Sequence, residues 1–84
     1  MSEQQAIAQT RYYLSLAKQA FKQDFLFPVV SFDLGGKTAG YFKRVSSGRC
    51  EINYNRQLLN LHTRDFLQRT VPHEVAHLVA YQVY

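Results

Sequence analysis

The chain has 84 residues, which limits it to one domain below the commonest domain size. Its hydrophobic content of 46%, with six Phe and six Tyr, excludes a disordered chain, and no apolar run is long enough to cross a membrane. The net charge is +4, the N-terminus lacks signal-peptide character, and the single cysteine, Cys50, excludes an internal disulfide, so we expect a cytoplasmic protein with no membrane partner.

The first element predicted along the chain is an amphipathic helix. Apolar residues recur with mostly helical spacing from Ala6 to Phe21, and polar residues fill the other positions. The helix should begin at Ser2 and end near Lys22–Asp24, because Pro28 favours an extended chain just before it.

Three strands are expected next. Val29 to Leu34 alternates between apolar and polar residues, and further strands are predicted from Ala39 to Val45 and from Arg49 to Tyr54. Gly35-Gly36 and Ser46-Ser47-Gly48 lie between them as turns. Because short loops favour hairpins, the prediction is a three-stranded antiparallel sheet and an α+β fold. A lone cysteine in a strand usually behaves as a small buried hydrophobic residue. We interpret Cys50 in this way.

The middle of the chain carries most of the excess positive charge. Its cations are Lys37, Lys43, Arg44, Arg49 and Arg56, against Asp33 and Glu51. One interpretation is a contact with nucleic-acid phosphates, and the other is a solvated sheet edge whose charges discourage strand pairing between molecules.

A short helix or turn is expected from Asn55 to His62, followed by one helix from about Arg64 to the C-terminus with Thr63 as its N-cap. Pro72 lacks the backbone donor that a helix interior requires, so either the helix kinks there or a new helix begins near Thr70. The apolar residues of its last part predict a buried helix.

That final helix contains the run His73-Glu74-Val75-Ala76-His77, which has the pattern H-E-x-x-H. Residues four apart share one face of a helix, so both imidazoles can bind one zinc ion. Glu74 projects too far round the helix to be a natural third ligand and is suited to accept a proton from a metal-bound water. The competing interpretation is a helix whose histidines only form hydrogen bonds.

A catalytic zinc ion needs three protein ligands and an open position, and the motif supplies two. His62 and Asp65 lie too far upstream along the helix, and no His, Cys, Asp or Glu follows between Leu78 and Tyr84. Cys50 and Glu51 lie on a strand whose distance from the helix is not readable from sequence. We therefore expect the third ligand outside these 84 residues.

The chain resembles the SprT family of zinc metallopeptidase-like proteins over nearly its whole length. The resemblance rests on the order helix, three strands, helix and on three segments: Lys37-Thr38-Ala39-Gly40-Tyr41, Glu51-Ile52-Asn53-Tyr54-Asn55 and Thr70-Val71-Pro72-His73-Glu74-Val75-Ala76-His77. It implies that residues 1–84 are the N-terminal part of a single SprT-like metallopeptidase domain. The implied fold is an incomplete minimal zincin, with a third histidine ligand on a following helix.

The resemblance also implies a function for the full-length parent. His73 and His77 would bind one zinc ion, and Glu74 would act as the acid/base that hydrolyses a peptide bond with zinc-activated water. A family relative, the Spartan protease, degrades proteins crosslinked to DNA, so a DNA-associated protein is the implied substrate. Lys43, Arg44 and Arg49 are the candidate DNA contacts, and the third strand is a candidate edge for an extended substrate. Tyr41, Tyr54 and Tyr81 are expected in the core. The alternative is a non-catalytic zinc-containing module that binds DNA or protein.

Two expectations concern the 84-residue chain by itself. With two ligands it should bind zinc weakly or not at all and should be inactive. The exposed apolar face of its last helix should favour self-association.

Overall fold

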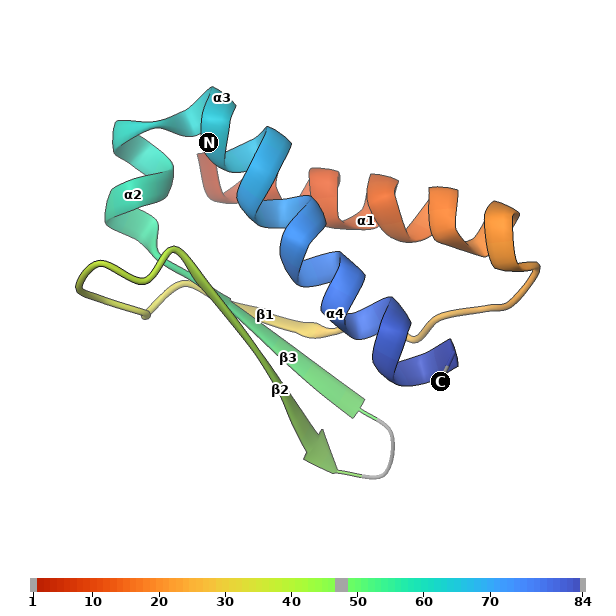
Figure 1. Cartoon of the computed structure of the whole chain (residues 1–84). Helices are drawn as coiled ribbons and strands as arrows, with labels where there is room; N and C mark the ends of the chain where they lie inside the picture. Colours follow the sequence, from red (N-terminus) through yellow and green to blue (C-terminus); the bar gives the residue numbers. More distant parts are fainter. Residues whose placement is uncertain (1, 47–48, 84) are drawn as a thin grey trace.

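The computed structural model describes residues 2–46 and 49–83, which form two layers (Figure 1). A three-stranded sheet forms one layer, and the helices lie together over one of its faces. The elements are α1 (Ser2–Phe21), β1 (Val29–Ser31), β2 (Gly40–Ser46), β3 (Arg49–Tyr54), α2 (Arg56–Leu61), α3 (Thr63–Asp65), the π-helical η1 (Phe66–Thr70) and α4 (Val71–Val83). The α+β prediction is confirmed. No described helix is both long and apolar enough to span a membrane.

The sheet is mixed, so the prediction of a purely antiparallel sheet is wrong. Its strand order is β1-β3-β2, in which β2 pairs with β3 antiparallel and β1 pairs with β3 parallel. The predicted third strand is therefore the centre of the sheet and not an edge. The predicted turn at Ser46-Ser47-Gly48 falls partly outside the described residues.

The burial of β3 explains its central place. Its inward side chains, Cys50, Ile52 and Tyr54, are all buried, and pairing on both sides satisfies the backbone groups of such a strand. The segment after β1 is held against β3 by Asn53, whose Oδ1 accepts hydrogen bonds from the backbone N–H groups of Asp33 and Leu34. Gly35-Gly36 therefore turns the chain past β3 toward the far edge, instead of pairing β1 with β2.

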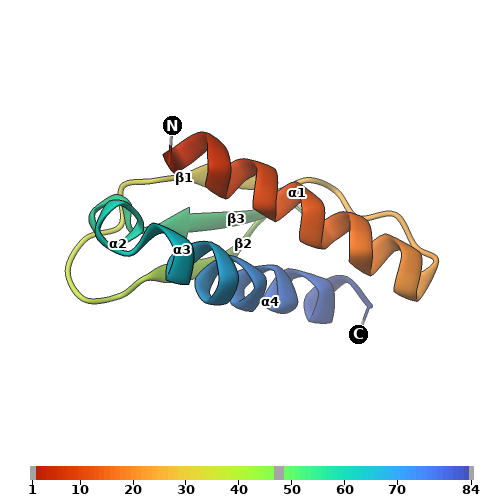
Figure 2. The ribbon, with the colours of Figure 1, turned by 90° about the horizontal axis from the view of Figure 1, so that it is seen from above.

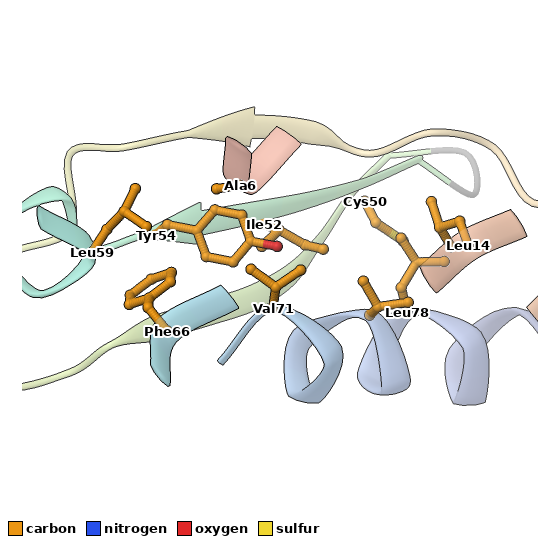
Figure 3. Close-up of a cluster of buried hydrophobic side chains, with 10 residues drawn as sticks. Ala6, Leu14, Cys50, Ile52, Tyr54, Leu59, Phe66, Val71 and Leu78 are labelled. Carbon is orange, nitrogen blue, oxygen red and sulfur yellow. The ribbon is translucent and has the colours of Figure 1, made fainter. Parts of the chain in front are cut away.

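The core lies between the inner face of β3 and the helices (Figure 3). Ala6 and Leu14 reach it from α1, and Val71 and Leu78 reach it from the C-terminal helix. Cys50 is buried there, as predicted. Within this core the hydroxyls of Thr10 and Tyr54 form a buried hydrogen bond of 2.7 Å, which links α1 to β3.

The C-terminal helical segment differs from the prediction in two respects. Thr63 is not an N-cap: its hydroxyl donates to the carbonyl of Leu59, and His62 precedes the helix without a capping side chain. A π-helical segment replaces the predicted simple kink, and the N–H of Val71 donates to the carbonyl of Phe66. Helix α4 then runs beside α1 and lies on the β2 side of the sheet (Figure 2).

Candidate metal centre

The three motif residues of helix α4 differ in their exposure to solvent. Glu74 is buried, with 5% of its surface exposed, whereas His73 and His77 are exposed. The prediction of a buried helix holds in part: α4 buries Val71, Val75 and Leu78 and leaves Ala76 and Ala80 exposed. The histidines lie at the boundary between the core and solvent.

The two imidazoles converge through the same ring atom. The Nε2 atoms of His73 and His77 are 3.2 Å apart, and the ring planes are at 90°. Two nitrogen ligands at about 2.0–2.1 Å from a tetrahedral zinc ion would be separated by about 3.3 Å. The 3.2 Å separation is within hydrogen-bond distance of the two rings, and it is also close to the separation of two ligand positions of a zinc site.

Glu74 is held against a glycine of the neighbouring strand. A Cβ on Gly40 would lie 2.9 Å from Cγ and 3.0 Å from Oε2 of Glu74, so a larger residue at this point of β2 would force the Glu74 side chain to move. Burial raises the pKa of the Glu74 carboxyl above its ordinary value, and the nearby His77 and His73 imidazoles oppose part of this shift. A carboxyl whose pKa is raised holds a proton more readily than an exposed one, which suits a proton acceptor.

A hollow of about 290 Å³ lies between β2 and α4 at these residues. Its lining is Gly40, Tyr41, Phe42, His73, Glu74 and His77. The ring of Phe42 stacks on the imidazole of His77. A second hollow of about 310 Å³ extends from Gly40 toward Thr70 and Arg69. Strand β2 therefore forms one wall along the motif helix.

The other residues considered as metal ligands lie elsewhere. Cys50 is buried in the core, and Glu51 projects from the opposite face of β3, where it accepts from the Ser31 hydroxyl and pairs with Lys43. His62 and Asp65 precede η1. Among residues 2–46 and 49–83, no three His, Cys, Asp or Glu side chains gather into a metal-binding group.

The cations proposed for DNA contact are all exposed but differ in their surroundings. Lys43 pairs with Glu51 at 3.6 Å, while the guanidinium of Arg44 lies 5.1 Å from the ring centre of Tyr81. Arg49 is exposed at the start of β3. They share the β2–β3 hairpin, and contact with DNA stays a prediction.

The tyrosine prediction holds for one residue of three. Tyr54 is fully buried, but Tyr41 and Tyr81 are 52% and 37% exposed. Tyr41 belongs to β2, an edge strand, and its side chain alternates with that of Phe42, which faces α4. Tyr41 therefore points to the uncovered face of the sheet.

Sequence reasoning gave no role to Gly40 or Phe42, although both line the site. The available signal was a glycine inside a predicted strand, which indicates a close approach by another group. The sequence did not reveal which group approaches Gly40, because the packing of β2 against α4 depends on the tertiary fold.

An apolar hollow of about 390 Å³ lies between α1 and α4, away from β2. It is lined by Tyr13, Ala17, Phe21, Pro72, Val75, Ala76, Val79 and Ala80. The sequence predicted an exposed apolar face on the last helix only, and this hollow also includes residues of α1. Self-association stays a prediction.

Comparisons with known proteins identify the family of the chain. Residues 10–84 match the model of the SprT-like family, so the chain belongs to that family and the predicted resemblance is confirmed. No solved structure matches the chain.

Individual relatives carry the name Protein SprT. The chain is 42% identical to that of Vibrio parahaemolyticus over 71 residues, which is 84% of this chain and 41% of the relative. It is 46% identical to that of Pseudomonas syringae pv. tomato over 68 residues, which is 81% of this chain and 40% of the relative. The chain therefore spans less than half the length of the relatives that it matches.

Proposed function

We propose that residues 1–84 form the N-terminal part of a zinc-dependent peptidase domain of SprT type. The observation that carries this proposal is the 3.2 Å separation of the His73 and His77 Nε2 atoms beside the buried carboxyl of Glu74. A third ligand would come from outside residues 1–84; the match covers 41% and 40% of the two SprT relatives. Membership of the SprT-like family supports the proposal.

In this proposal His73 and His77 would hold zinc, since their Nε2 atoms converge. When bound, the ion supplies a water of lowered pKa and an electrophile for the scissile carbonyl. Glu74 accepts the proton of the attacking water and returns it to the leaving amine. Gly40 and the surrounding core restrict the orientation of the carboxyl and limit its contact with bulk water.

The wall of the hollow suggests how a protein substrate would bind. Strand β2 pairs with β3 on one side only, so an extended polypeptide could add to its other edge beside the motif. This assigns substrate pairing to β2 and replaces the earlier expectation for the third strand, which is central.

The test is made on a longer protein that contains this chain and the remaining part of the domain. Glu74→Gln should abolish peptide-bond hydrolysis while zinc content stays stoichiometric, because glutamine keeps the shape but cannot accept the proton. Glu51→Gln is the matched control, since Glu51 lies on the opposite face of the sheet. A folded, zinc-loaded protein without activity on unfolded or DNA-bound proteins would contradict the proposal.

A second candidate is a non-catalytic zinc-containing module that binds DNA or protein. The exposed positions of Lys43, Arg44 and Arg49 on one hairpin favour its DNA version and equally a peptidase that acts on DNA-associated proteins. Neutralising these cations should weaken DNA binding and reduce its salt dependence. Binding that survives Glu74→Gln in a protein without hydrolysis would favour the module.

A further inference from the structure

Asn55, at the end of β3, is fully buried although its side chain is polar. Its Nδ2 donates to the backbone carbonyls of Gly36 and Thr38, both at 3.0 Å, and its Oδ1 accepts from the N–H of Leu58 at 3.1 Å. Its backbone N–H donates to the carbonyl of Ala39 at 2.8 Å. One residue thus fixes the segment 36–39 and the start of α2 together.

The segment that Asn55 holds leads directly into β2, the strand that lines the hollow at the H-E-x-x-H residues. Gly40 follows Ala39, begins β2 and lies against the carboxyl of Glu74. The position of the Gly40 backbone therefore depends on a segment held from behind by two side-chain and one backbone hydrogen bonds.

Capping of α2 does not explain the choice of residue. Ser, Thr and Asp accept the same N-cap hydrogen bond as Asn. Only a carboxamide offers two N–H donors together with an acceptor, and Asn55 uses all three of these functions. Both donors bond only to the segment before Gly40, so the side chain holds that segment in addition to capping α2.

We propose that Asn55 is a positioning residue of the candidate metal centre. It touches neither the histidines' hollow nor a reacting atom; it holds residues 36–39 so that Gly40 closes on Glu74 and sets the orientation of that carboxyl. The importance of this orientation rests on the proposed function, because Glu74 is there the acid/base.

The structural claim is tested on the metal-free 84-residue chain by NMR. Asn55→Ser keeps a capping oxygen but removes both donors to the segment. We expect shifted resonances for the Gly40 amide, the Glu74 side chain and the His73 and His77 rings. Amide exchange of residues 39–41 should become about tenfold faster relative to α2, since buried hydrogen bonds are lost. Gly40→Ala should shift the same Glu74 and histidine resonances.

Asn53→Ala is the matched control for general destabilisation. It removes the side chain that holds Asp33 and Leu34, which lie before the turn and away from the hollow. Site resonances that move equally in Asn53→Ala and Asn55→Ser would reduce Asn55 to a purely structural role and overturn the proposal.

Two further outcomes also decide the matter. Unchanged Glu74 and histidine resonances in folded Asn55→Ser would overturn the proposal. If that variant does not fold, the wild-type chain is measured instead. We expect slow hydrogen exchange of the Asn55 side-chain amide and a nuclear Overhauser effect between Gly40 Hα and Glu74 Hγ. The absence of either signal would contradict the proposal. Since no readout uses catalysis, failure of the peptidase proposal and failure of this one are separable.

Discussion

The imidazole of His77 stacks on the phenyl ring of Phe42, with ring centroids 6.1 Å apart and planes within 18° of parallel. Phe42 also contacts Tyr81, one turn further along α4, at a centroid separation of 6.3 Å. One side chain of an edge strand therefore limits the rotation of a motif histidine on a surface where that ring is otherwise exposed.

Replacing Phe42 by leucine keeps an apolar side chain but removes the stacked ring. We expect Phe42→Leu to lower the free energy of unfolding by about 0.5–1.5 kcal/mol, the typical contribution of an aromatic pair. Urea unfolding measures this loss, and the His77 ring resonances should broaden or shift. Phe32→Leu removes the contact of Phe32 with Tyr54 and should leave the His77 resonances unchanged.

Gly40→Ala should destabilise the chain by about 1–3 kcal/mol, because its Cβ would overlap the Glu74 side chain and force it to move. Gly35→Ala is the control, since no atom lies within 4 Å of its added Cβ. In a double-mutant cycle, Glu74→Ala should recover much of the loss caused by Gly40→Ala. Additive effects in that cycle would show that the two side chains do not compete for the same space.

The buried hydrogen bond between Thr10 and Tyr54 predicts unequal effects of its two deletions. Tyr54→Phe leaves the Thr10 hydroxyl bonded to the carbonyl of Ala6 and should cost about 0.5–1.5 kcal/mol. Thr10→Val leaves the buried Tyr54 hydroxyl without its partner and should cost about 1–3 kcal/mol. Denaturant unfolding of both variants and the double variant measures the coupling, and equal losses would contradict this order.

Stability should fall in alkaline solution because burial raises the pKa of Tyr54 far above its ordinary value of 10.0. The neutral phenol is retained in the folded chain, whereas the unfolded chain ionises near the ordinary value. The contribution of the neutral Tyr54 phenol to the free energy of unfolding is therefore complete below about pH 9 and decreases as the pH rises past about 10. Tyr54→Phe should reduce the slope of unfolding free energy against pH, while Tyr12→Phe, at an exposed tyrosine, should not.

Zinc should bind weakly to the 84-residue chain, through His73 and His77. Calorimetric titration should show a weak interaction that disappears in either His73→Ala or His77→Ala, because each imidazole supplies half of the pair. His62→Ala removes an exposed histidine before α3 and should change nothing. A tight one-to-one complex would mean that a third ligand exists within the chain.

The elements of the fold were largely predictable from local patterns. The third strand has the predicted limits, the second is shifted by one residue, and the first helix ends near the predicted position. The parallel pairing of β1 with β3 was not predictable, because it joins Val29–Ser31 to residues 51–53, which are distant in the chain.

The site was predictable where it depended on helix spacing and not where it depended on tertiary contacts. Spacing alone placed His73 and His77 on one face, and the structure brings their Nε2 atoms together. It did not reveal the burial of Glu74 against Gly40 or the stacking of Phe42, because β2 approaches α4 only in the folded chain.

The π-helical segment has a consequence for the direction of the motif. Phe66 and Val71 are both buried although they are five positions apart, which matches the span of the hydrogen bond that joins them. If the same residues adopted ordinary α geometry, with no deletion, everything downstream of this turn would be rotated by about 100°. The histidines would then no longer face β2. The helix after η1 is thus one residue out of phase with the helix before it, and that phase difference directs the H-E-x-x-H residues toward the strand.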